Sequence, residues 1–248
     1  MKSQSISELV EQDNVRAYVL YYFGIRFYEY SGHTLEQVCR ERGLSLETVL
    51  KELEQPGINF TESELPLMNN YPLDLIIEYL KHAHFIFVKH KLPYIGRLVE
   101  SFKANHKQYD SVEKDLKILF PLFLEDFIHH IYEEEDTLFK YINLLEKAAN
   151  GKANPARLYY MMEKSSLQKC AVEHEAHDDE MAGIRKITKD YHLTADAPLH
   201  VKVIYTELMQ FEKSLITHAR VENEILFPKA LALENQVKNK FFERSKLN

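Results

Sequence analysis

The chain has 248 residues, of which 31 are lysine or arginine and 38 are aspartate or glutamate, so its formal net charge is −7. This balance argues against general binding to nucleic acids or anionic membranes, both of which need a basic surface. The composition, 45% hydrophobic and 28% charged, is that of a globular protein with a packed core. Only 7 glycines and 8 prolines are present, which disfavours a turn-rich β fold, and we expect an all-α protein.

The cysteine content predicts a reducing compartment. Cys39 and Cys170 are too few for a disulfide framework or a thiolate metal cage, and each is expected to be a small buried hydrophobe. The first residues show no secretory signal, and no stretch approaches the roughly 18 uninterrupted apolar residues of a membrane-spanning helix. We therefore expect a soluble cytoplasmic protein.

Residues 1–57 are predicted to form a small helical N-terminal domain. Apolar residues recur at roughly helical spacing in its second half. Thr34 followed three residues later by Gln37 is a capping-box pattern, which marks a helix start, and Gly43 separates that helix from the next. Proline and glycine then interrupt the pattern, and residues 58–72 are predicted to be a linker.

Residues 73–236 are predicted to form a four-helix bundle, and residues 237–248 a C-terminal tail. The long helical segments are expected at about 73–103, 110–149, 155–190 and 198–233. Pro93 and Pro121 fall inside the first and second segments. Each should kink or split its helix, because proline removes an amide donor.

A repeated pattern of histidine and glutamate marks the second and fourth segments. The second segment carries His130, Glu134, Leu138 and Phe139, and the fourth carries His218, Glu222, Leu226 and Phe227. The two sets lie 88 positions apart (218 − 130), which suggests a duplicated helix hairpin. Residues four apart share a helix face, so each His and Glu pair can point toward one central spot.

The other two segments offer His84 and His174, at a similar interval of 90 positions (174 − 84). Imidazole nitrogen with carboxylate oxygen suits iron, manganese or zinc, and two carboxylates able to bridge favour two metal ions over one. The predicted metal ligands are His84, His130, Glu134, His174, His218 and Glu222. Such a site would keep open positions for a small ligand.

The alternative is that these are ordinary histidines on charged helices. With 12 histidines in the chain, one His-x-x-x-Glu pair is weak support for a site, whereas two matched pairs are stronger. The acidic run 133–136 could be a solvated face, although any member that turned inward would be costly to bury without a cation. We expect His129 and His177 to point elsewhere, and Phe120, Phe123, Phe127 and Phe211 to be ordinary core.

The repeat, with Glu173-His174-Glu175 and the stretch 218–228, resembles the hemerythrin-like di-iron proteins that repair iron-sulfur clusters. Residues 5–54 look like that family's short N-terminal domain, notably at 24–27 and 34–39. The resemblance implies a hemerythrin-like bundle with two non-haem, carboxylate-bridged iron ions. The terminal iron ligands that it implies are His130, His174 and His218. The ligands that it implies to bridge the two irons are Glu134 and Glu222.

Two departures from the family pattern stand out. Where the family usually has a Cys-Cys pair, this chain has Tyr28-Glu29, so thiol chemistry in the N-terminal domain is not expected. In the first segment the family's histidine column falls near Phe85, one place after His84. His84 lies on the apolar helical stripe and is kept as the fourth histidine, with a one-residue helix irregularity to align it, and His82 is the alternative.

The leading hypothesis is a di-iron protein that binds or reduces nitric oxide or oxygen and protects or repairs iron-sulfur clusters under nitrosative or oxidative stress. The alternatives are a non-catalytic sensor or storage module for a diatomic gas or iron, and a metal-free scaffold. The sequence leaves open whether the protein is an enzyme. Expected partners are the diatomic ligand and iron-sulfur proteins, with no nucleic acid and no membrane, and a homodimer remains an open option.

Overall fold

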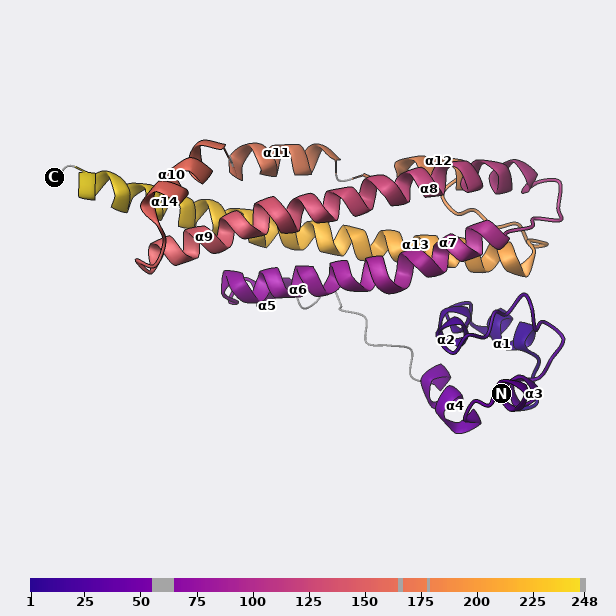
Figure 1. Cartoon of the computed structure of the whole chain (residues 1–248). Helices are drawn as coiled ribbons and strands as arrows, with labels where there is room; N and C mark the ends of the chain where they lie inside the picture. The colour runs from indigo at the N-terminus through magenta and orange to yellow at the C-terminus, as the bar shows by residue number, and fades with distance from the viewer. Residues whose placement is uncertain (55–64, 165–166, 178, 246–248) are drawn as a thin grey trace. The chain divides into compact units, whose positions relative to one another are not determined.

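The computed structural model describes residues 1–54, 65–164, 167–177 and 179–245. All named elements in these ranges are helices, and no strand occurs among them. The described chain is an all-α helical bundle (Figure 1), so the predicted fold class is confirmed. Within the described ranges, no helix is both long enough and apolar enough to cross a membrane.

The N-terminal part contains the helices α1 (Ile6–Gln12), α2 (Arg16–Tyr22), α3 (Leu35–Arg42) and α4 (Leu46–Glu54). The predicted capping box is present at the start of α3. Gln37 N donates to Thr34 Oγ1 at 3.3 Å, and Thr34 N donates to Gln37 Oε1 at 2.9 Å. Gly43 ends α3 with φ of +66°, a left-handed conformation that glycine adopts without strain. Residues 55–64, which include most of the predicted linker's first half, lie outside the described residues.

The rest of the chain follows the predicted segments, with differences inside them. After α5 (Leu65–Met68), the elements are α6 (Leu73–Ile86), the π-helix η2 (Phe87–Lys91) and α7 (Leu92–Ser101), then α8 (Asp110–Glu133), the π-helix η3 (Glu134–Leu138) and α9 (Phe139–Ala149). They continue with α10 (Pro155–Lys164), α11 (Leu167–His177), α12 (Ala182–Thr188), α13 (Leu199–Val221), the π-helix η4 (Glu222–Leu226) and α14 (Phe227–Ser245).

The third and fourth segments depart most from the expected helix lengths. The third is not one long helix, since residues 179–181 interrupt it between α11 and α12. The sequence before this break is highly polar and offers little apolar surface to stabilise a continuous helix. The fourth continues to Ser245, past the expected end near residue 233, because neither glycine nor proline occurs between residues 229 and 245. Pro93 lies at the start of α7, where the first segment divides, whereas α8 runs through Pro121 unbroken.

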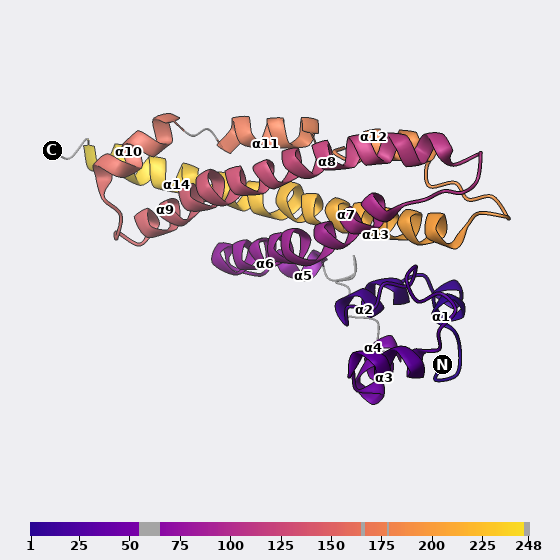
Figure 2. The same ribbon diagram turned by 45° about the vertical axis from the view of Figure 1, so that its right-hand side comes forward.

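The described residues form two compact units, and most contacts of each unit are internal to it. The first holds α1 to α4, α7, α12 and the N-terminal parts of α8 and α13. The second holds α5, α6, α9 to α11, α14 and the C-terminal parts of α8 and α13. In the second unit α9 and α11 pack against α14, and α6 packs against η4. Figures 1 and 2 both show α9 alongside α14. All the predicted ligands belong to this second unit.

In the first unit, the neighbouring residues Tyr28 and Glu29 both have structural contacts. The Tyr28 ring stacks on His200 of α13, with centroids 5.2 Å apart and an interplanar angle of 11°. Glu29 pairs with Arg26 at 2.8 Å. Burial lowers the pKa of His200 to about 4, so this imidazole is neutral at pH 7. Tyr28 therefore packs the N-terminal part of this unit against His200 and its aromatic neighbours.

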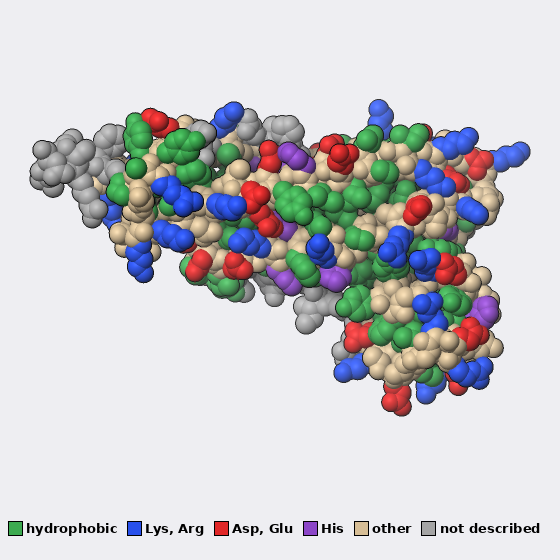
Figure 3. All heavy atoms as spheres, in the orientation of Figure 1, with side chains coloured by type: hydrophobic (Ala, Val, Ile, Leu, Met, Phe, Trp, Pro, Cys, Tyr) green, Lys and Arg blue, Asp and Glu red, His purple; other side chains and the backbone are tan. Residues whose placement is uncertain are grey.

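The core assignments made from the sequence are confirmed, with one exception. The four phenylalanines assigned to the core are all buried: Phe120, Phe123, Phe127 and Phe211. Cys39 is buried as expected, whereas Cys170 is only partly buried, and both are free thiols. On the face drawn in Figure 3, acidic and basic side chains are both spread among hydrophobic ones.

The capping box at α3 makes a stability prediction. Thr34→Ala removes the acceptor for the Gln37 amide and should lower the free energy of unfolding by about 1 kcal/mol. Urea unfolding followed by circular dichroism measures this loss. The matched control is Thr48→Ala, an exposed threonine inside α4, which should change stability by less than about 0.5 kcal/mol. An equal effect of the two substitutions would contradict the importance of the cap.

Candidate metal centre

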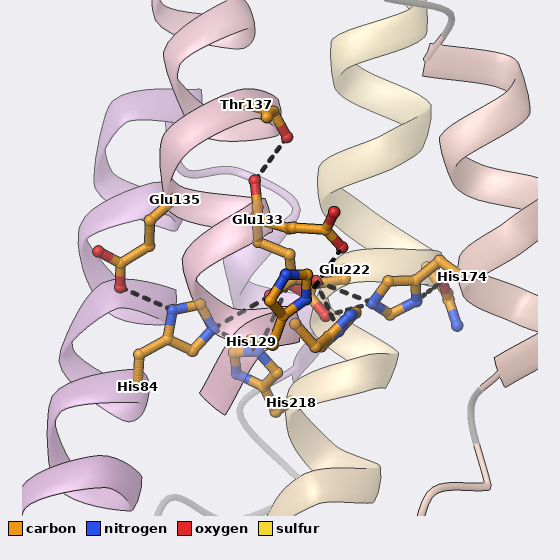
Figure 4. A network of polar contacts seen from close by, with 11 residues as sticks. His84, His129, Glu133, Glu135, Thr137, His174, His218 and Glu222 are labelled. Atoms are coloured by element: carbon orange, nitrogen blue, oxygen red, sulfur yellow. Dashed lines mark hydrogen bonds and ion pairs between the residues drawn. The ribbon is translucent and has the colours of Figure 1, made fainter. Parts of the chain in front are cut away.

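The structure brings the six residues singled out from the sequence together in the second unit. They come from different helices and form two groups of side chains that share one glutamate. The first group is His84, Glu134, His218 and Glu222, and the second is His130, Glu134 and His174. Within each group the ligand atoms lie within 4.8 Å of one another. Figure 4 shows the imidazoles converging on the carboxylates from several helices.

In the first group, two imidazole nitrogens face each other. The Nε2 atoms of His84 and His218 are 3.0 Å apart. His84 Nε2 lies 3.3 Å from Glu134 Oε2, and His218 Nε2 lies 3.4 Å from Glu222 Oε1. With metal–nitrogen bonds of about 2.0–2.1 Å, as at zinc, two nitrogens can share one ion at such a separation.

In the second group, His130 and His174 approach the other sides of the two carboxylates. His130 Nε2 lies 3.2 Å from Glu134 Oε1, and His174 Nε2 lies 3.1 Å from the same oxygen. His174 Nε2 is also 3.0 Å from Glu222 Oε2. Each carboxylate thus presents one oxygen to the first group and the other oxygen to the second group.

The two glutamates are deeply buried and incompletely satisfied. Glu134 is 5% exposed and Glu222 is 1% exposed. Glu134 Oε2 and both oxygens of Glu222 make no well-directed hydrogen bond among the described residues, although imidazole nitrogens lie near them. Buried carboxylates without such bonds are costly unless a cation compensates them. The donor set and its unsatisfied oxygens therefore fit a metal ion.

Local backbone geometry explains how the residues reach these positions. The π-helices η3 and η4 begin at Glu134 and Glu222, at equivalent points of the repeat. A π turn inserts one extra residue, so the helix face rotates after each glutamate. The His and Glu pair can then face the centre while the following Leu-Phe pairs, 138–139 and 226–227, are buried in the core.

The first segment has the helix irregularity expected from its one-residue mismatch. The π-helix η2 begins at Phe87, three residues after His84. His84 is buried in the first group, whereas His82 and Phe85 are exposed. The structure thus brings His84, and not His82, to the other donors.

Several residues next to the candidate ligands in the sequence are exposed and lie outside the two groups. His129 and Glu133 are exposed, with 3.8 Å between His129 Nδ1 and Glu133 Oε2. Asp136 pairs with Lys140 at the surface, at 2.6 Å. Only Glu134 of the run 133–136 is buried, so most of this run is a solvated face. The side chain of His177 lies outside the described residues.

Two residues that the sequence analysis did not identify accept hydrogen bonds from the Nδ1 atoms of the histidines. His84 Nδ1 donates to Glu135 Oε1 at 2.9 Å, and His174 Nδ1 donates to Asn223 Oδ1 at 3.1 Å. These bonds leave each Nε2 directed toward the carboxylates. The available signal was position, since each acceptor directly follows one of the two glutamates in the sequence.

The protonation of the group without metal follows from its contacts. Burial lowers the pKa of His130, but the bond and charge of Glu134 outweigh it and raise the pKa to about 9. Burial acts in the same way on His174, whose contacts with Glu134 and Glu222 raise its pKa to about 11. Burial raises the pKa of Glu134, yet the surrounding imidazoles hold it well below its usual range. Without metal, protons on the imidazoles thus compensate the carboxylates, and a metal ion would displace them.

Comparisons with known proteins give distant relatives. No family model matches the chain. It is similar to the iron-sulfur cluster repair protein YtfE of Yersinia pseudotuberculosis and of Yersinia pestis, with 22% identity over 160 residues in each case. The match covers 64% of this chain and 66% of those proteins, just under two thirds of their length. Iron-sulfur cluster repair proteins are therefore its distant relatives.

The raised pKa of His130 predicts a pH dependence of stability in the metal-free protein. The folded state keeps a proton up to about pH 9 that the unfolded state releases near pH 6.5. This stabilisation is complete below pH 6.5 and is lost as the pH rises through about 9. Urea unfolding with a chelator across this range should show a falling free energy of unfolding.

The histidine next to it provides the control. His130→Gln should remove part of this decline, whereas His129→Gln, at an exposed position, should leave it unchanged. Identical profiles for the wild type and His130→Gln would contradict the assignment.

Proposed function

We propose that this chain is a non-haem di-iron protein that binds or reduces nitric oxide or oxygen and protects or repairs iron-sulfur clusters under nitrosative or oxidative stress. One observation carries the proposal. Two buried glutamates each offer one oxygen to the pair His84 and His218 and the other oxygen to the pair His130 and His174. This arrangement suits two ions bridged by carboxylates better than one ion.

The choice of iron has two supports. Mixed imidazole and carboxylate donors suit iron among other first-row metals, and the distant relatives are named for iron-sulfur cluster repair. Bound iron would supply redox chemistry and open positions for a diatomic ligand. His84, His130, His174 and His218 would be its terminal ligands, and Glu134 and Glu222 would bridge.

Aromatic rings would shield the centre from water. Phe139 stacks on His84 with centroids 5.8 Å apart, Phe227 packs edge-on to His174 at 5.5 Å, and Phe87 packs edge-on to His218 at 5.7 Å. An apolar shell of this kind limits solvent access and strengthens electrostatic interactions inside it. A small uncharged gas is a suitable ligand for a centre with such apolar surroundings. Iron-sulfur proteins are the proposed partners. Two free cysteines support a reducing, cytoplasmic location.

A second candidate function is a non-catalytic sensor or storage module. The observation that favours it lies in the N-terminal domain, where Tyr28 stacks on His200 and Glu29 pairs with Arg26. The family that the sequence resembles usually has a cysteine pair at positions 28 and 29. With Tyr28 and Glu29 at these positions, this part of the chain offers no thiol for metal transfer. Catalytic consumption of nitric oxide by the reduced protein would support the enzyme. Spectral shifts on binding, without consumption, would support the sensor.

The metal content of anaerobically purified protein tests the centre itself. We expect about two irons per chain. Glu134→Ala combined with Glu222→Ala should abolish iron binding, because both shared carboxylates are lost. The control is Glu133→Ala combined with Asp136→Ala, which removes two exposed carboxylates of the same run and should leave the iron content unchanged. Zinc or no metal after iron reconstitution, or iron retained by the first double variant, would refute the proposal.

A further inference from the structure

The two halves of the repeat support their histidines with different chemistry. Glu135 and Asn223 occupy equivalent positions of the repeat, 88 residues apart (223 − 135), each directly after a shared glutamate. Glu135 accepts the Nδ1 proton of His84, and Asn223 accepts that of His174. Figure 4 shows Glu135 beside His84 on one side of the centre and His174 on the opposite side. A carboxylate thus stands in one half where an amide stands in the other.

This difference changes how strongly each histidine binds a metal. A carboxylate makes a charge-assisted hydrogen bond, which is stronger than the bond to a neutral amide. It draws the Nδ1 proton away from the ring and makes Nε2 a more basic ligand. The hydrogen-bond lengths are consistent with this difference in strength, because the bond of His84 is 2.9 Å long and that of His174 is 3.1 Å long. His84 should therefore be the stronger donor.

A difference in burial favours the same half of the centre. His84 and His218 are both buried, whereas His130 and His174 are only partly buried. Greater solvent access weakens the hold on an ion.

We propose that the two ion positions are unequal, that the position of His84 and His218 fills first and binds more tightly, and that Glu135 and Asn223 set part of this difference. The inference rests on the proposed di-iron centre. Glu135 and Asn223 are positioning residues, because they act through the histidines and not on the ions. The position of His130 and His174 then exchanges its ion first.

The test is an anaerobic titration of the metal-free protein with ferrous iron, in which calorimetry measures the heat of binding. The wild type should show two steps of unequal affinity. Glu135→Gln gives His84 the amide that His174 has, and should weaken the tighter step by about tenfold. Asn223→Asp makes the reverse change and should tighten the weaker step by a similar factor. The two variants thus reduce the difference from opposite sides.

A matched control separates the contact from the overall charge. Glu133→Gln removes the same charge two residues away from Glu135, at an exposed side chain, and should leave both steps unchanged. Circular dichroism checks that helix content is retained, and the gain of affinity expected for Asn223→Asp cannot arise from misfolding.

The outcomes distinguish this inference from the proposed function. Two ions bound with equal affinity, or no difference of either variant from the Glu133→Gln control, would overturn the inference and leave the di-iron centre standing. A wild-type protein that binds no iron would overturn both.

Discussion

The burial of Glu134 and Glu222 is the constraint on which the second unit depends. Removing a carboxylate from water costs several kcal/mol even after the protein relaxes, so it must be compensated nearby. Here four imidazoles from four segments of the chain surround the two carboxylates. In the absence of metal, protons on the histidines provide that compensation, and a metal ion would replace them. The same contacts therefore govern the stability of the metal-free protein and would govern the binding of the proposed ions.

Backbone irregularity is how the helices meet this constraint. A regular α-helix keeps one face toward a given neighbour, yet the repeat needs polar side chains inward at one turn and bulky apolar ones inward at the next. The π turns at Glu134 and Glu222 supply the rotation between these requirements. Such turns are rare in proteins, and many of those that occur lie at functional sites. Their occurrence at both glutamates links the duplicated sequence to the geometry of the centre.

The two halves of the repeat are not fully equivalent. Equivalent positions supply equivalent donors, but the residues behind the donors have diverged to Glu135 in one half and Asn223 in the other. In the first unit, Tyr28 stacks on His200 of α13 and has a packing role. Differences at supporting positions can therefore change the chemistry while the ligand pattern stays intact.

Local patterns in the sequence determined the all-α fold, the capping box at Thr34, the break at Gly43 and the spacing within each of the two His and Glu pairs. These features depend on residues within about four positions of one another, and the helical period makes them readable. The tertiary structure decided the π turns, the break before α12, and the contacts of Glu135 and Asn223. Those features depend on which helices pack together, because a hydrogen bond between His84 and Glu135 joins residues that only the fold brings within reach.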